Sequence, residues 1–126
     1  MERLLTVLLG ARVAPPEEIS ADTIPRGVVV RRGRLIPRIG GLLCRMSGPA
    51  AAVTLGRTIV VCPGVRLSPG LLAHELVHVR QWRDDPWFPV RYCLQTLRHG
   101  YRNNPYEVEA RECSASLVNP ADKRDD

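Results

Sequence analysis

Residues 68–82 read SPGLLAHELVHVRQW, and this stretch decides how the second half of the chain folds. Ser68 followed by Pro69 is typical of a helix start, with a capping side chain and then proline in the first helical position. We therefore expect a helix that extends to about the end of this stretch. Because His74 and His78 are four residues apart, both imidazoles project from one face of that helix.

Residues 74–78 read HELVH and match the H-E-x-x-H pattern of helical zinc sites. Two imidazoles with this spacing lie close enough to share one tetrahedral ion. Leu72, Leu76 and Val79 recur on the opposite face of the helix. We therefore expect the helix to pack on a sheet through these residues and to leave the histidines facing a cleft.

Glu75 is placed to reach a water molecule bound to the ion without ligating the ion itself. Zinc lowers the pKa of bound water, and a nearby carboxylate can take its proton and deliver it to a leaving amine. This interpretation makes His74 and His78 metal ligands and Glu75 the catalytic base of a zinc-dependent peptidase. The competing interpretation is two exposed histidines beside a surface glutamate.

A catalytic zinc normally has three protein ligands and one open position, so a third donor must come from elsewhere in the chain. The candidates downstream of the motif are three carboxylates and one imidazole: Glu107, Glu109, Glu112 and His99.

Residues 107–110 read EVEA, and with this pattern the chain resembles the gluzincin peptidases, in which the first Glu of a later Glu-x-x-Ala helix is the third zinc ligand. The resemblance covers roughly residues 50–117, is nearest to the small single-domain minigluzincins, and implies that Glu107 is the third ligand. It also implies a peptide or protein substrate, bound in extended form along an edge strand at residues 52–55. Arg111 departs from the family pattern, which often has Asp or Asn at that position.

Other interpretations of these candidates stay open. Glu107 also fits a capping box with Asn104 as the N-cap, or an ion pair with Arg111 four residues later. Glu109 points roughly 200° away from Glu107 on the same helix, so the two cannot both face one ion. His99 would instead make a three-histidine site.

Gln81 and Tyr106 are the candidates for supporting the ligands or a developing oxyanion. Gln81 lies seven residues beyond His74 and returns to nearly the same helix face, although a polar residue at the rim of a cleft would read the same way. Tyr106 is one of three tyrosines, with Tyr92 and Tyr101, whose phenols can donate to an oxyanion, and spacing does not select among them. The cluster Trp82, Trp87 and Phe88 is more typical of core packing.

The fold that we expect is α+β: a small twisted, mainly antiparallel sheet packed on the HELVH helix, which two further helices follow. Predicted strands cover residues 28–30, 52–55 and 58–62, and the last two flank a Gly56-Arg57 hairpin turn. Residues 36–44 are ambiguous.

The two later helices are expected over residues 89–98 and 105–117. With 126 residues and 44% hydrophobic content, we expect a single domain over residues 1–126. Residues 119–126 are expected to form a flexible tail, whose aspartates offer an autoinhibitory contact with the open zinc position.

The formal net charge of +5 permits an acidic partner. However, the arginines of the first half are scattered without interleaved aromatic residues, which favours a solvated basic face over nucleic-acid binding. They are Arg26, Arg31, Arg32, Arg34, Arg38 and Arg45.

The four cysteines have neither zinc-finger nor disulfide-scaffold spacing. They read as buried thiols in a reducing compartment, which favours the cytoplasm. Arg3 ahead of the apolar run Leu4–Leu9 leaves a secreted alternative open. That run is far shorter than the roughly 20 residues needed to span a membrane.

Two other classes of function remain beside the peptidase. One is a non-catalytic, zinc-stabilised regulatory or effector module in which the same ligands hold the fold and binding is the activity. The other is a basic nucleic-acid-associated protein whose histidines are incidental.

Overall fold

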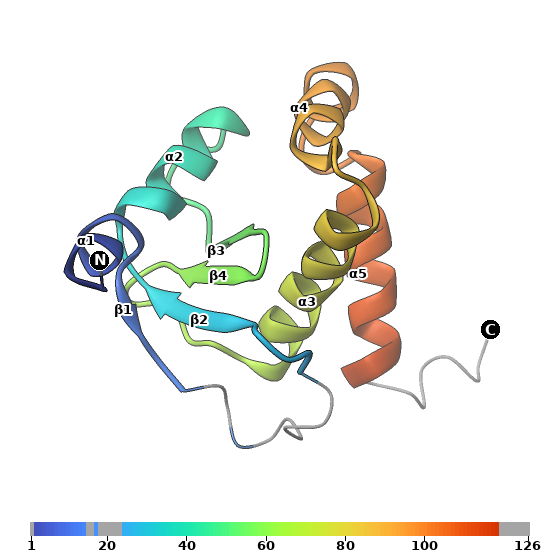
Figure 1. The fold of residues 1–126 in the computed structure, drawn as a ribbon. Coiled ribbons are helices and arrows are strands. Elements are labelled where there is room, and N and C mark those ends of the chain that lie inside the picture. Colours follow the sequence, from blue (N-terminus) through green and yellow to red (C-terminus); the bar gives the residue numbers. More distant parts are fainter. Residues whose placement is uncertain (1, 15–16, 18–23, 119–126) are drawn as a thin grey trace. The chain divides into compact units, whose positions relative to one another are not determined.

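The computed structural model describes residues 2–14, 17 and 24–118, and its elements are labelled in Figure 1. The described residues form five helices and a four-stranded mixed sheet, which confirms the predicted α+β class. They divide into two compact units, Met1–Leu67 with the sheet and Ser68–Asp126 with the HELVH helix. The packing of the sheet on that helix, and a single domain over the whole chain, stay predictions. Within the described part, no helix combines the length and the hydropathy needed to cross a bilayer.

The sheet has the strand order β1-β2-β4-β3. The strands are β1 (Ala11–Arg12), β2 (Val29–Arg32), β3 (Ala52–Leu55) and β4 (Thr58–Val61). β1 pairs antiparallel with β2, and β3 pairs antiparallel with β4, while β2 and β4 are parallel. Two of the three pairings are therefore antiparallel, as expected, and the parallel one joins strands that are not consecutive in the sequence.

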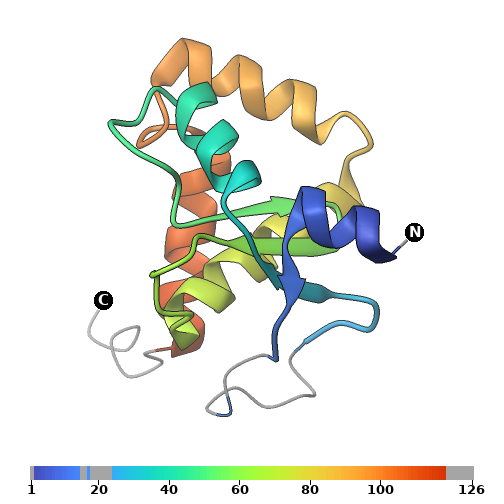
Figure 2. The same cartoon turned by 90° about the vertical axis from the view of Figure 1, so that its left-hand side faces the viewer.

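The β3–β4 hairpin, the green ribbon in Figure 2, forms where the sequence predicted it. Its turn is Gly56-Arg57, and Gly56 has φ +63°. Glycine is favoured there because the Cβ of any other residue would clash with the backbone in this conformation. β4 is flanked by a strand on each side, and Ile59, Val60 and Val61 are fully buried. β3 lies at the edge of the sheet.

Two helices complete the first unit, α1 (Glu2–Leu9) and α2 (Leu35–Leu43). α2 resolves the segment that was ambiguous from the sequence. The prediction of a solvated basic face is wrong for Arg31, which is only 4% exposed, although Arg26, Arg34, Arg38 and Arg45 are exposed. Its guanidinium donates to the carbonyl oxygen of Gly10 and to Oε1 of Glu2, so it ties α1 to the sheet.

The second unit consists of α3 (Pro69–Asp84), α4 (Phe88–His99) and α5 (Pro105–Val118). All three predicted helices are found, each with ends within about two residues of the expected ones. α3 lies against α5 in both views (Figures 1 and 2) and also contacts α4.

Two side-chain predictions in the second unit are wrong. Trp87 is 64% exposed instead of buried, because it precedes α4 in the turn after α3. Cys93 is an exposed free thiol. The predicted tail, residues 119–126, lies outside the described residues.

Candidate metal centre

α3 brings His74 and His78 to one face, as the spacing predicted. The hydroxyl of Ser68 accepts a hydrogen bond from the backbone N–H of Leu71 (3.1 Å), and Pro69 occupies the first turn. The ring centroids of the two histidines are 5.0 Å apart. His78 is buried, whereas His74 keeps part of its ring exposed.

α5 begins at an anchored cap. Asn104 is fully buried, and its Oδ1 accepts a hydrogen bond from the backbone N–H of Tyr106 (2.9 Å), as an N-cap does. Its Nδ2 also donates to the carbonyl oxygen of Tyr92 and to Oγ1 of Thr96 on α4. This one side chain therefore fixes the start of α5 against α4 and sets the position of the residue three places on, Glu107.

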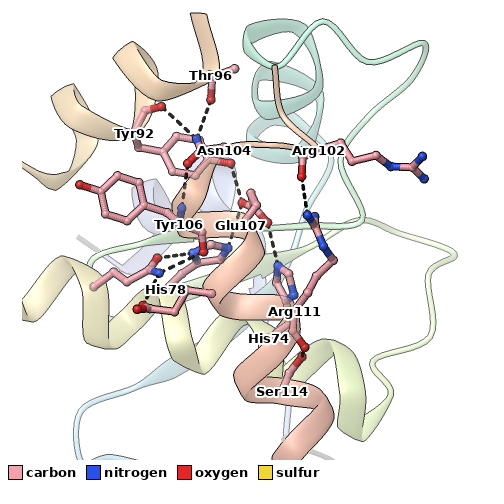
Figure 3. A network of polar contacts seen from close by, with 12 residues as sticks. His74, His78, Tyr92, Thr96, Arg102, Asn104, Tyr106, Glu107, Arg111 and Ser114 are labelled. Atoms are coloured by element: carbon pink, nitrogen blue, oxygen red, sulfur yellow. Dashed lines mark hydrogen bonds and ion pairs between the residues drawn. The ribbon is translucent and has the colours of Figure 1, made fainter. Parts of the chain in front are cut away.

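The Glu107 carboxylate lies between the two histidines (Figure 3). Its Oε1 is 2.9 Å from Nε2 of His74, and its Oε2 is 3.0 Å from Nε2 of His78. The donor atoms of these three residues lie within 4.8 Å of one another, so the group can hold a metal ion. Two imidazole nitrogens and one carboxylate oxygen form the donor set of many catalytic zinc sites.

Charges in this group are strongly coupled. Burial lowers the pKa of His78, but the hydrogen bond to Glu107 and the negative charges of Glu75 and Glu107 outweigh burial and raise it to about 9. Burial raises the pKa of Glu107, yet the hydrogen bonds from His74, His78 and Tyr92 bring it far below its usual range. Without a metal, the centre is therefore an imidazolium–carboxylate pair.

Gln81 orients the His78 ring. Its Oε1 lies 2.7 Å from Nδ1 of His78, while its Nε2 donates to the carbonyl oxygen of Tyr106 (3.1 Å) and to Oε1 of Glu109 (2.8 Å). Because these two acceptors fix the orientation of the amide, its oxygen must accept a hydrogen bond from the Nδ1–H group of His78. Nε2 of His78 is thereby directed at the centre. Gln81 is buried, so the alternative of a rim residue does not hold.

Tyr92, which spacing could not single out, contacts the centre directly. Its hydroxyl donates to Oε2 of Glu107 at 2.6 Å. Tyr106, the retained candidate, instead contributes its backbone carbonyl to Gln81 and packs its ring edge-on against Phe88, with 5.0 Å between centroids. Phe88 and Tyr92 lie one helical turn apart on α4, but this spacing does not indicate that the hydroxyl of Tyr92 reaches Glu107 on α5.

The other interpretations of the third donor fare differently. The backbone N–H of Asn104 donates to Tyr101, and the Glu107 carboxylate faces the histidines, so no capping box forms. Arg111 donates to the backbone carbonyl of Arg102 instead of pairing with Glu107. Glu109 is a partner of Gln81 and Arg80. His99, exposed at the end of α4, is not part of the cluster.

Glu75 is 4% exposed, and its charge contributes to the raised pKa of His78, so its carboxylate lies near that ligand. One side of the centre is open: a pocket of about 600 Å³ is lined by His74, Tyr101, Arg102 and Arg111. His74 is thus shared between the three-residue group and a solvent-accessible pocket.

Comparison with known proteins gives one match. The family model described as the eCIS core domain matches residues 45–86, which is 42 of the 126 residues. The matched segment runs from before β3 to the end of α3 and includes the HELVH motif, but it ends before Glu107. No curated protein and no solved structure matches the chain.

Proposed function

We propose that this protein is a zinc-dependent peptidase of the gluzincin type, in which His74, His78 and Glu107 hold the metal and Glu75 is the general base. The observation that carries the proposal is the position of the Glu107 carboxylate, 2.9 and 3.0 Å from the Nε2 atoms of the two histidines. The model of the eCIS core domain matches residues 45–86, the segment that contains HELVH, so the match includes both proposed histidine ligands and the proposed base.

The donor set fits zinc. Neutral imidazole nitrogens and a carboxylate oxygen suit this ion, and the two histidines are already oriented with Nε2 toward the carboxylate. Zinc bound there supplies a Lewis acid that polarises the scissile carbonyl and makes water acidic enough to react near neutral pH.

The residues of the chain perform the remaining steps. Glu75 takes the proton of the attacking water and passes it to the amine that leaves. Gln81 and Tyr92 are positioning residues: the first directs Nε2 of His78 toward the centre, and the second holds one oxygen of Glu107 by a 2.6 Å hydrogen bond. Such partners keep ligands in their working orientation and fix the tautomer of a ligating histidine.

Catalysis is favoured over a purely structural metal role by the open side of the centre. Structural zinc sites are usually closed by four protein ligands, whereas catalytic sites keep one position for water or substrate. Among the described residues the cluster contains three donors, and one of them, His74, lines a pocket.

The test compares the wild type with Glu75→Gln, using zinc content and hydrolysis of denatured casein as readouts. We expect about one zinc per chain in both proteins and activity only in the wild type, since Glu75 acts on water and does not hold the metal. Glu112→Gln, at an exposed position of α5, is the matched control and should keep full activity. Equal activity of the wild type and Glu75→Gln removes the mechanism, and zinc binding without hydrolysis in the wild type leaves the zinc-stabilised binding module as the better account.

A further inference from the structure

The pocket beside the metal centre is lined mainly by basic and polar side chains. Two of its four lining residues, Arg102 and Arg111, carry permanent positive charge, and all four belong to the Ser68–Asp126 unit. Neither arginine has an ion-pair partner among the described residues. Glu107, the carboxylate of the three-residue group, is already engaged by two histidines and a tyrosine. Within the part of the chain that the structure describes, no ion pair therefore compensates the positive charge of the two arginines.

Arg111 is held in place. It follows Glu107 by four residues on α5, one helical turn, so both side chains leave the helix on the same side. Its guanidinium donates to the backbone carbonyl of Arg102, which fixes the long side chain next to His74 (Figure 3). One such bond leaves most of the five guanidinium N–H donors for a ligand.

We propose that this pocket binds a carboxylate of the peptide substrate, with Arg111 as the specificity-determining residue and Arg102 as a second source of charge. The proposal rests on the peptidase function above and names its substrate class. A guanidinium suits this ligand because it can donate two parallel hydrogen bonds to one carboxylate. Since His74 belongs both to the pocket and to the centre, the carboxylate is one close to the scissile bond.

Two sources supply the same chemistry: the side chain of Asp or Glu, and the free C-terminus of the peptide. Binding is therefore measured with fluorescent peptides in matched sets. One set has Glu, Gln or Lys at each position around the cleavage site, and the other has a free or an amidated C-terminus. The protein is zinc-loaded Glu75→Gln, which keeps all three proposed ligands and removes the proposed base, so that affinity is read without turnover.

We expect the peptide with the carboxylate to bind about tenfold more tightly than its uncharged counterpart, which is near the lower end of the range for a hydrogen bond to a charged group. Adding Arg111→Ala should remove most of this difference, since only Arg102 then remains as a positive charge in the pocket, and should leave the affinity for the uncharged peptide and the zinc content unchanged. Arg111→Glu should invert the preference toward Lys. Arg98→Ala, an exposed arginine on α4 outside the pocket, should retain the full preference.

Preference confined to the Glu peptides assigns the pocket to an acidic side chain, and preference confined to the free terminus assigns it to the C-terminal carboxylate; either supports the proposal. Equal affinity for charged and uncharged peptides overturns it, as does an equal loss in Arg98→Ala, which would mean general charge attraction. The wild type is assayed for cleavage of the same peptides. If the wild type cleaves the peptides without preferring those with a carboxylate, the pocket proposal is contradicted and the peptidase function stands. If the protein binds the carboxylate peptides but cleaves none of them, the peptidase function is contradicted and carboxylate binding by the pocket stands.

Discussion

Zinc binding to the metal-free protein should release a proton from His78. The pKa of this imidazole is raised to about 9, so at pH 7 about 99% of it is protonated, and the ion must displace that proton to reach Nε2. Glu107 contributes none, because its pKa lies far below neutrality. We therefore expect about one proton from His78 per zinc at pH 7 and an apparent affinity that rises about 50-fold between pH 7 and pH 9, as the neutral fraction of His78 grows from about 1% to about 50%.

The assay is calorimetric titration of zinc in buffers of different ionisation enthalpy, since the slope of the observed enthalpy gives the number of protons released. The pKa of His78 is measured directly by NMR titration of the metal-free protein. In Glu75→Gln, one of the charges that raises this pKa is removed, so the imidazole should titrate at lower pH. A titration of His78 near pH 6.5 in the wild type, with no buffer dependence of the zinc enthalpy, would refute the coupled imidazolium–carboxylate pair.

Glu107→Ala should lose most of its zinc affinity, whereas His99→Ala should bind about one zinc per chain, as measured by equilibrium dialysis. If Glu107→Ala keeps its metal, Glu107 is not a ligand and the capping interpretation is favoured. Asn104→Ala should lower the free energy of unfolding by about 2–4 kcal/mol in urea denaturation, because it removes a cap and takes the buried Nδ2 donor away from two part-buried acceptors on α4. The exposed Asn103→Ala is its control, and equal losses in the two would show that the anchor at the start of α5 contributes little. In the metal-free protein, the raised pKa of His78 contributes stability that is complete below pH 6.5 and is lost as the pH rises through about 9. The urea midpoint should fall over that interval without zinc and not with it, and a flat profile without zinc would contradict the pair.

The HELVH helix was predictable because its signals are local. Ser68 and Pro69 define the start, and the four-residue spacing of His74 and His78 alone places both rings on one face. Glu107 came from a family resemblance, and sequence reasoning could not separate a ligand from a capping residue. The deciding fact, the direction of its carboxylate, depends on how α5 lies against α3, which no local pattern encodes.

The features that escaped prediction are those set by contacts distant in the sequence or by close packing. Tyr92 reaches Glu107 across 15 residues, and the parallel pairing of β2 with β4 skips a strand. α2 was ambiguous because it contains Pro37, Gly40 and Gly41, which disfavour helix on propensity. A Cβ on Gly41 would lie 2.2 Å from the carbonyl oxygen of Gly48, so packing requires glycine there in spite of its cost to the helix.

The central claim is that His74, His78 and Glu107 hold zinc together. The most direct measurement is anomalous diffraction at the zinc edge from crystals grown with stoichiometric zinc. We predict one strong anomalous peak, from a zinc ion bonded to Nε2 of both histidines and to an oxygen of Glu107. The fourth coordination position of this ion should be filled by a non-protein ligand. A zinc ion bound at the cysteine thiols, or one coordinated by four protein ligands, would contradict this account.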